Sequence, residues 1–275
     1  MAWFEYHIKF EESKKEIVNA FLISADVDAI LDQEDHFVCY KSNPEDPEVF
    51  KTTLSHLPGV EGEITYQICE EKNWNADWEA NYDPIGIENI CYIRAEFHQS
   101  NPDFPFEIII RPQMAFGTGH HETTYMMIQM MNEVDFTGKE ILDYGCGTGI
   151  LSIFAAMLKC QSVKGIDIEG PAIENSILHQ SINSFENFSM DFELGGLEIL
   201  SDDRYDIILA NINRGVLLKT KEGICNHLKP KAKLLMSGIL KSDESLILEK
   251  YGDTFDLLQR KEKGEWLCFL FQAKN

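Results

Sequence analysis

Residues 141–151 read ILDYGCGTGIL, and this stretch decides the fold. An apolar strand ends at Asp143, and Gly145, Gly147 and Gly149 follow at alternate positions before a helical stretch. Glycine has no Cβ, so it reaches positive φ and lets the backbone lie against a flat ligand. The G-x-G-x-G spacing differs from the G-x-G-x-x-G of dinucleotide-binding turns, and no Gly-Lys-Ser or Gly-Lys-Thr accompanies it. The turn therefore predicts a ligand with adenosine and an amino-acid tail but no phosphate, and Asp143 can reach the ammonium group of that tail.

Helices and short apolar strands alternate from residue 119 onward, through EILDYG (residues 140–145), SVKGIDI (162–168) and YDIILANI (205–212). This alternation predicts an α/β fold with a mainly parallel, doubly wound sheet, which binds ligands at the carboxyl ends of its strands. A closing hairpin pairs residues 255–260 with residues 266–272. That antiparallel end distinguishes Rossmann-like methyltransferase sheets from ordinary dinucleotide-binding sheets.

The beginning of the chain has a different pattern of short strands with two helices between them. Strands are expected at residues 3–10, 27–31, 36–41 and 64–68, and helices at residues 13–21 and 47–56. The order βαββαβ predicts a ferredoxin-like α+β domain over residues 1–71, a fold that hosts many binding functions. We expect a linker helix at residues 72–84 and a catalytic domain at residues 85–275. Trp74 and Trp78 would share one face of that linker, where packing is favoured over ligand contact.

The strand after the glycine turn ends with a carboxylate. Asp167 lies about twenty residues past the glycines, where nucleotide-binding folds place an acid that accepts hydrogen bonds from the ribose hydroxyls. The alternative is a helix cap shortly before Pro171. Because the glycine turn precedes it, we favour ribose binding for Asp167.

A polar amide follows the next predicted strand, in ANIN (residues 210–213). A lysine amine has a pKa of about 10.4, so its nucleophilic neutral form costs about 4–5 kcal/mol at pH 7. A carboxylate contact would favour the ammonium form and increase that cost. The amide of Asn211 can instead orient a neutral amine, which makes this residue the predicted catalytic group. The alternative is a structural asparagine in a turn.

The loop MAFGTGHHETT (residues 114–124) precedes a helix. The run His120–Glu122 suggests a metal, but adjacent histidines lack the i, i+4 spacing of H-E-x-x-H, so we expect none. A loop that closes over the cofactor is favoured, with Gly117 and Thr118 in contact with it and a threonine at the helix start donating a hydrogen bond. The run YMMIQMM (residues 125–131) is expected to pack in the core.

Composition restricts the partners and the compartment. The 275 residues carry a formal net charge of −22, which repels phosphate backbones and argues against direct nucleic-acid binding. No run of about 18 apolar residues exists, so we expect no membrane span, and the first residues do not resemble a signal peptide. The seven cysteines are dispersed without a C-x-x-C pair, which is typical of a reducing cytoplasm. We expect a cytoplasmic monomer.

Several segments together resemble the ribosomal protein L-eleven methyltransferases (PrmA type), which are class I methyltransferases. The loop AFGTGHHETT is similar to that family's AFGTGTHPTT, and DYGCGTGILSI is similar to DFGCGSGILAI. Counterparts also exist for GIDIEGPAI, ANINRGVL, SGIL, GEWLCF and the connector NWNADWEANYDPI. The resemblance covers residue 73 to the C-terminus, and the first seventy residues only in layout.

The resemblance implies S-adenosylmethionine as the methyl donor. It implies lysine side-chain and α-amino groups of a basic ribosomal protein, L-eleven, as acceptors, with the N-terminal domain recognising that protein. Matching positions place the cofactor contacts at Thr124, Gly145, Asp167 and Asn211. Two departures bear on substrate choice, because His120-His121-Glu122 replaces Thr-His-Pro and Asn213-Arg214 replaces Leu-Ala.

Three other functions remain open from the sequence. The first is a methyltransferase for lysine in another protein or for a small amine. The second is a nicotinamide-dependent oxidoreductase, which the glycine spacing disfavours. The third is a non-catalytic adaptor that binds basic proteins, against which the complete set of cofactor residues argues.

Overall fold

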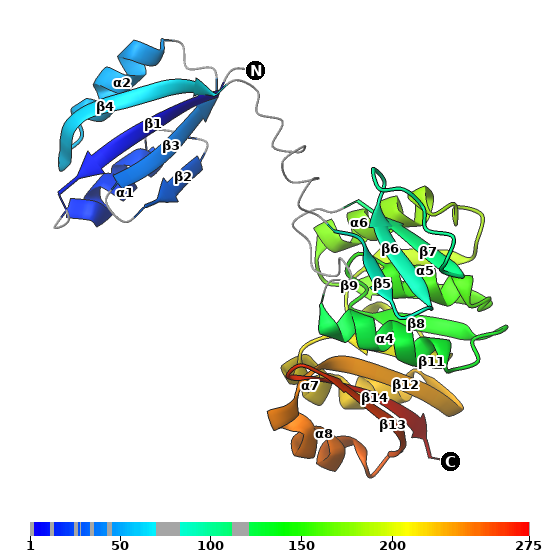
Figure 1. Cartoon of the computed structure of the whole chain (residues 1–275). Helices are drawn as coiled ribbons and strands as arrows, with labels where there is room; N and C mark the ends of the chain where they lie inside the picture. The colour runs from blue at the N-terminus through cyan, green and yellow to red at the C-terminus, as the bar shows by residue number, and fades with distance from the viewer. Residues whose placement is uncertain are drawn as a thin grey trace. The chain divides into compact units, whose positions relative to one another are not determined.

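The computed structural model describes residues 3–11, 14–24, 27, 29–33, 36–42, 46–69, 83–111 and 121–274. The chain divides into two compact units, Met1–Tyr82 and Asp83–Asn275 (Figure 1). The expectations for Trp74, Trp78 and most of the linker at residues 72–84 lie outside the described residues. None of the described helices is both long and apolar enough to cross a membrane.

The first unit contains a four-stranded antiparallel sheet in the order β2-β3-β1-β4. Its elements are β1 (Trp3–Phe10), α1 (Lys15–Ser24), β2 (Ala29–Asp32), β3 (His36–Ser42), α2 (Pro47–Ser55) and β4 (Val60–Cys69). Alternate residues of β1 (Tyr6, Ile8 and Phe10) are buried with residues of both helices, so α1 and α2 cover the same face of the sheet. This is the predicted ferredoxin-like arrangement.

The predicted start of α2 at Pro47 is confirmed. Proline suits the first helical turn because its missing N–H would have no intrahelical partner. Asp46 precedes it as the N-cap, and its Oδ1 accepts hydrogen bonds from the backbone N–H groups of Glu48 at 2.9 Å and Val49 at 3.3 Å.

The second unit is built on a seven-stranded sheet in the order β10-β9-β8-β11-β12-β14-β13. The strands are β8 (Glu140–Tyr144), β9 (Ser162–Asp167), β10 (Met190–Leu194), β11 (Tyr205–Asn211), β12 (Leu228–Leu240), β13 (Phe255–Lys263) and β14 (Trp266–Ala273). The first five pair in parallel, whereas β14 is antiparallel to both of its neighbours. The predicted doubly wound α/β fold with an antiparallel end is therefore confirmed.

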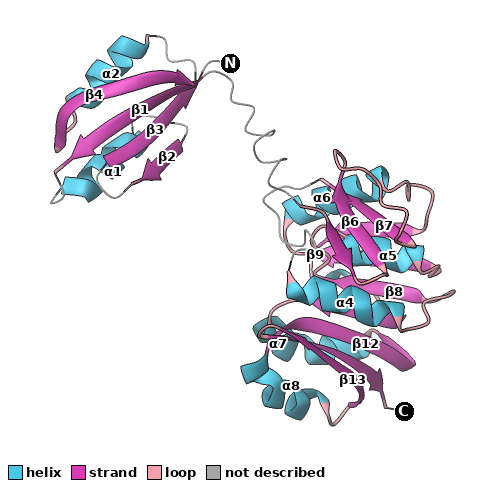
Figure 2. Ribbon diagram, in the orientation of Figure 1, coloured by secondary structure: helices cyan, strands magenta, loops and turns pink. Residues whose placement is uncertain are grey.

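Helices cover both faces of this sheet (Figure 2). They are α4 (Glu122–Asn132), α5 (Ile150–Met157), α6 (Gly170–Ile182), α7 (Arg214–Asn226) and α8 (Glu244–Tyr251), with short 3₁₀ turns at Leu197–Ile199 and Lys241–Asp243. Strand β14 contacts both layers because successive side chains point to opposite faces. Leu267, Phe269 and Phe271 join a core with residues of α7 and α8, while the Cys268 sulfur lies 3.6 Å from that of Met127 on α4. The predicted core role of residues 125–131 is confirmed for the buried methionines of that helix.

A second, three-stranded sheet in this unit has the order β5-β6-β7. Its strands are β5 (Ile85–Ile87), β6 (Cys91–Ala95) and β7 (Phe106–Ile110). Strand β5 has only three residues, so the sequence holds no alternating pattern long enough to reveal it. The Phe106 ring packs edge-on against that of Phe154 on α5, with centroids 5.5 Å apart, so this sheet rests on the helices.

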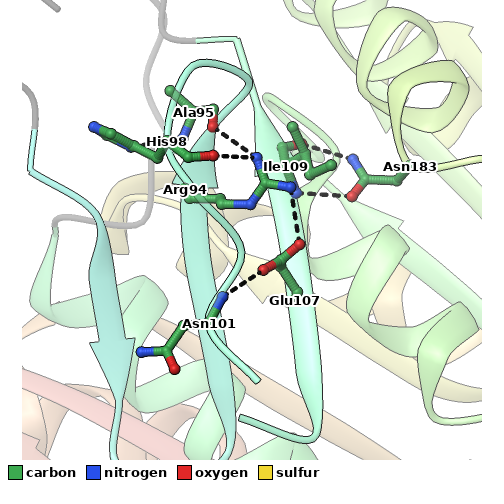
Figure 3. A network of polar contacts seen from close by, with 7 residues as sticks. All are labelled: Arg94, Ala95, His98, Asn101, Glu107, Ile109 and Asn183. Atoms are coloured by element: carbon green, nitrogen blue, oxygen red, sulfur yellow. Dashed lines mark hydrogen bonds and ion pairs between the residues drawn. The ribbon is translucent and has the colours of Figure 1, made fainter. Parts of the chain in front are cut away.

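A polar network connects β6, β7 and the loop between them (Figure 3). The Arg94 guanidinium donates through Nη1 to the backbone oxygens of Ala95 at 3.0 Å and His98 at 2.9 Å. Its Nη2 donates to Glu107 Oε1 at 2.9 Å, and Glu107 Oε2 accepts from the Asn101 N–H at 3.2 Å. The ion pair between Arg94 and Glu107 thus connects β6 to β7 and also fixes the loop between them.

Side chains of α6 close the outer edge of β7. The Asn183 amide, at the end of α6, accepts from the Ile109 N–H at 2.8 Å and donates to the Ile109 carbonyl at 2.6 Å (Figure 3). Four residues earlier, His179 Nε2 accepts from the Arg111 N–H at 3.0 Å. Four helical residues rise about 6.0 Å and two strand residues about 6.6 Å, so the two spacings match.

Candidate functional site

The glycine turn leads from β8 to α5. Gly145, Gly147 and Gly149 have φ of 74°, 54° and 75°, which side chains rarely adopt. The N–H groups of Gly145 and Cys146 both donate to the Ile166 carbonyl, at 2.8 and 3.0 Å. A Cβ on Gly145 would lie 2.3 Å from Ile212 Cγ2, so glycine is also required there by space.

The carboxylate at the end of β9 contacts this turn. Asp167 Oδ2 accepts from the Gly147 N–H at 2.9 Å, and Oδ1 accepts from the Glu169 N–H at 3.1 Å. Glu169 is the N-cap residue of α6, so Asp167 does support a helix start, as the alternative interpretation proposed. The two bonds also set the orientation of the carboxylate beside the glycine turn.

The amide at the end of β11 is held from α4. Asn211 Nδ2 donates a long hydrogen bond of 3.4 Å to Thr124 Oγ1. The other amide atom, Asn211 Oδ1, is buried without a hydrogen-bond partner among the described residues. A buried acceptor left unpaired costs about 1–3 kcal/mol, and such an atom is a candidate contact for a ligand donor.

The start of α4 shows what the histidine run does. His121 is the N-cap, and its Nδ1 accepts from the Thr123 N–H at 3.3 Å. The His121 ring also packs edge-on against Trp266, with centroids 4.7 Å apart. His121 therefore has a capping and packing role, and His120 lies outside the described residues.

A cavity of about 710 Å³ lies where these strand ends meet. Strand β8 has β9 on one side and β11 on the other, so the cavity is at the switch point of the doubly wound sheet. Four of the site residues predicted from the sequence line this cavity: Gly145, Gly147, Asp167 and Asn211. The structure thus brings these four together, as the geometry of the strands led us to expect.

The remaining predicted site residues do not line the cavity or are not described. Thr124 is 1% exposed and lies behind Asn211, whereas its neighbour Thr123 lines the cavity. Gly117 and Thr118 lie outside the described residues. Asp143 is also absent from the cavity lining, and its Oδ2 accepts from Ser152 Oγ on α5 at 2.6 Å.

The two departures in ANINRG have local structural roles. Asn213 caps α7, since its Oδ1 accepts from the Val216 N–H at 3.0 Å, and it also lines the cavity. Arg214 pairs with Asp243 at 2.6 Å. The polar character that they add therefore reaches the cavity through Asn213.

Sequence reasoning did not single out Gly238, Ile168 or Trp266, which also line the cavity. Gly238 lies within β12 and Trp266 begins β14, so only the strand order shows that they reach the site. A signal for Gly238 existed, because a glycine inside a long strand indicates a close backbone approach. At this glycine φ is +81°, and a Cβ would lie 2.2 Å from the Ile212 carbonyl oxygen.

Gly238→Ala should lower the free energy of unfolding by about 2–3 kcal/mol, because the new Cβ meets backbone atoms and the φ is strained. Gly264→Ala is the matched control, since φ is +55° but the nearest atom is 3.8 Å away. It should cost only about 1 kcal/mol. Urea unfolding measures both, and equal losses would contradict the role of the Ile212 contact.

Burial raises the pKa of Asp143 to about 7; the Ser152 hydrogen bond opposes this rise and the Asp167 charge adds to it. The raised pKa means that the folded protein prefers the neutral acid. The free energy of unfolding of the protein therefore falls as pH rises from about 4 to about 7. The amide of Asp143→Asn does not titrate, so the free energy of unfolding of this variant relative to the parent protein should rise by roughly 3 kcal/mol over that interval. Urea unfolding across the range checks this, and a constant difference would contradict it.

Several relatives that are all described as ribosomal protein L11 methyltransferases match most of the chain. The ribosomal protein L11 methyltransferase of Phocaeicola vulgatus is 38% identical over 234 residues, which is 83% of this chain and 83% of the relative. That of Bacteroides fragilis is 34% identical over 267 residues, or 94% of each chain. The nicotinamide-dependent alternative finds no support in these relatives.

Solved structures share the fold. A ribosomal protein L11 methylase from Lactobacillus delbrueckii subsp. bulgaricus has a TM-score of 0.66 at 23% identity, covering 70% of this chain and 100% of that chain. A methyltransferase from Pyrococcus furiosus has a TM-score of 0.51 at 17% identity, covering 61% and 89%. The family model for ribosomal protein L11 methyltransferase (PrmA) matches residues 4–274. The chain therefore belongs to the ribosomal protein L11 methyltransferase (PrmA) family.

Proposed function

We propose that this methyltransferase transfers methyl groups from S-adenosylmethionine to lysine side-chain and α-amino groups of ribosomal protein L11. The relatives carry that substrate in their names. The observation that carries the proposal is the cavity at the switch point, because Asp167 and Asn211 both line this one ligand-sized space.

The hydrogen bonds of the glycine turn support a ligand without phosphate. A phosphate-binding turn presents free backbone N–H groups to the anion. Here the N–H groups of Gly145 and Cys146 donate to Ile166, that of Gly147 donates to Asp167, and that of Gly149 donates to the Cys146 carbonyl. With these donors engaged and a carboxylate beside them, the turn suits an adenosyl ligand with an amino-acid tail better than a dinucleotide.

The donor's adenosine fits the side of the cavity formed by β9 and α6. Each carboxylate oxygen of Asp167 accepts one backbone N–H and retains capacity to accept a ribose hydroxyl. Ile168 follows directly, is 75% exposed and lines the cavity, as do Pro171 and Ala172. These apolar groups offer a surface for a flat base. The contacts proposed for Gly117, Thr118 and Thr124 come from the sequence.

The acceptor amine fits beside Asn211. When bound, S-adenosylmethionine supplies an electrophilic methyl group. Asn211 Oδ1 would accept an N–H of the incoming amine and hold its lone pair toward that methyl, while Thr124 keeps the amide in place. Asn211 is uncharged and so favours the ammonium form less than a carboxylate would. The amine loses its proton to water before attack, and Ile212 and Trp266 line the same space.

Charge supports a basic protein partner for the first domain. Residues 1–82 contain 18 acidic and 6 basic residues, a net charge of −12, while residues 83–275 contain 28 and 18, a net charge of −10. The smaller unit thus has the higher charge density, and complementary charge speeds association with a basic protein. Recognition by residues 1–71, with a connector at 72–84 and catalysis at 85–275, is part of this proposal. So are a cytoplasmic location, a monomeric state and the lack of direct nucleic-acid binding.

Incubation with isotope-labelled S-adenosylmethionine and purified ribosomal proteins tests the function. Label should appear in ribosomal protein L11, and mass spectrometry should locate it on lysine side chains and the α-amino group. Label in another protein, or only in added small amines, would replace this substrate assignment with the corresponding alternative. A thermal shift with NAD but not with S-adenosylmethionine would overturn the donor assignment.

A further inference from the structure

One buried histidine of the second unit contacts the glycine turn from outside the cavity. His179 is 1% exposed and lies in the last turn of α6. Its Nδ1 is 2.8 Å from the Thr148 carbonyl oxygen, and its Nε2 is 3.0 Å from the Arg111 backbone nitrogen. Thr148 lies between the two glycines that end the turn. Arg111 directly follows β7 and precedes the segment that contains Gly117 and Thr118.

The two partners determine the tautomer of the ring. A carbonyl oxygen only accepts, so Nδ1 must carry the hydrogen and donate to Thr148. Nε2 is then free of hydrogen and accepts from the Arg111 N–H at 3.0 Å, which is a shorter contact than the 3.3 Å between Nε2 and the Arg111 carbonyl oxygen. This tautomer is neutral, and burial lowers the pKa of His179, which favours the neutral ring. Both ring nitrogens are therefore used for backbone contacts.

Helix α6 also sets the space available to the turn. A Cβ on Gly149 would lie 3.0 Å from Ser176 Cβ, so the helix packs closely against the turn three residues before His179. On the side of the turn that faces the cavity, the Gly147 N–H donates a hydrogen bond to Asp167. His179 holds the carbonyl of Thr148, the next residue along the turn.

We propose that His179 is a positioning residue for the methyl donor. By tying Thr148 to the end of β7, it keeps the Gly147 N–H and the Asp167 carboxylate in the arrangement that the donor requires. His179 does not touch the donor. The ligand assignment rests on the function proposed above, whereas the contact between helix, turn and strand does not.

His179→Leu removes both hydrogen bonds, and His179→Gln keeps one donor and one acceptor about 2.2 Å apart, close to the separation of the two ring nitrogens. We expect the leucine variant to weaken binding of S-adenosylhomocysteine about tenfold or more by calorimetry. Turnover at saturating donor should change far less, because Asn211 is unaffected. The glutamine variant should restore most of the affinity.

Asn183→Leu is the matched control. It removes the same kind of contact between α6 and the β7 edge, at Ile109, but it does not touch the glycine turn. It should lower the melting temperature without weakening donor binding. Equal loss of affinity in the His179→Leu and Asn183→Leu variants, or unchanged affinity in the first, would overturn the positioning role.

Amide hydrogen exchange of the ligand-free protein separates this proposal from the donor assignment. Peptides over residues 145–149 should exchange faster in His179→Leu than in the parent protein or in Asn183→Leu. If the parent protein bound no S-adenosyl ligand, the proposed function would fail, and this exchange result alone would decide whether His179 holds the turn. Unchanged exchange would show that it does not.

Discussion

Asn211→Ala is expected to lower the turnover number by about 100-fold or more, which is the range for losing one group that orients a reactant. The amide is the polar group at the end of β11, its Oδ1 is buried without a partner among the described residues, and Thr124 holds its Nδ2. Removing it takes away the atom that would align the amine, while Asp167 and the glycine turn remain. The Kd for S-adenosylhomocysteine should therefore rise much less than turnover falls.

Initial rates with ribosomal protein L11 at saturating donor measure this effect. Asn226→Ala is the matched control, because Asn226 is exposed at the end of α7, and its rate should equal that of the parent protein. A normal rate for Asn211→Ala would remove the residue from the catalytic site. A parallel loss of donor affinity and turnover would instead assign Asn211 to donor binding alone.

Asp167→Ala is expected to raise the Kd for S-adenosylmethionine by roughly 10- to 100-fold, because hydrogen bonds to a charged group contribute about 1.5–3 kcal/mol. The variant loses the proposed ribose contacts and also the acceptor for the Gly147 N–H. Turnover at saturating donor should recover substantially, since Asp167 is remote from the amine in the proposed arrangement.

Isothermal calorimetry checks the Asp167 variant. Asp191→Ala removes an exposed carboxylate that pairs with Lys164 at 2.5 Å on the neighbouring strand. Surface pairs of this kind contribute about 0–1 kcal/mol, so its donor affinity should not change. Unaltered affinity in Asp167→Ala would reject the ribose role and leave only the helix-start role that the structure shows.

The parts of the site that follow from local sequence were predictable. Glycines at alternate positions after a strand, and polar residues at the ends of two further strands, follow from strand period and connection rules. The structure brings Gly145, Asp167 and Asn211 to one cavity, as those rules led us to expect. Their contact with the donor remains a prediction.

The parts that depend on distant chain segments were not predictable. A glycine inside a long strand indicates a close backbone approach at Gly238, but nothing in either segment alone reveals that the partner is the Ile212 carbonyl, which a Cβ would meet at 2.2 Å. Trp266 reaches the cavity because the hairpin turns back toward α4, where it meets His121. The contact of Asp143 with the ligand's amino-acid tail remains a prediction, and its hydrogen bond from Ser152, in the first turn of the following helix, was not foreseen.

The amide of Asn183 has a consequence for how the molecule behaves in a crowded solution. An outermost strand with unsatisfied backbone groups is a template on which a strand of another molecule can add, and such addition leads to aggregation. On β7 the Ile109 N–H and C=O are both engaged by Asn183, and the N–H of Arg111 just beyond it is engaged by His179. These helix side chains stand where a fourth strand would lie beside β7, and they protect that edge of the small sheet from intermolecular growth.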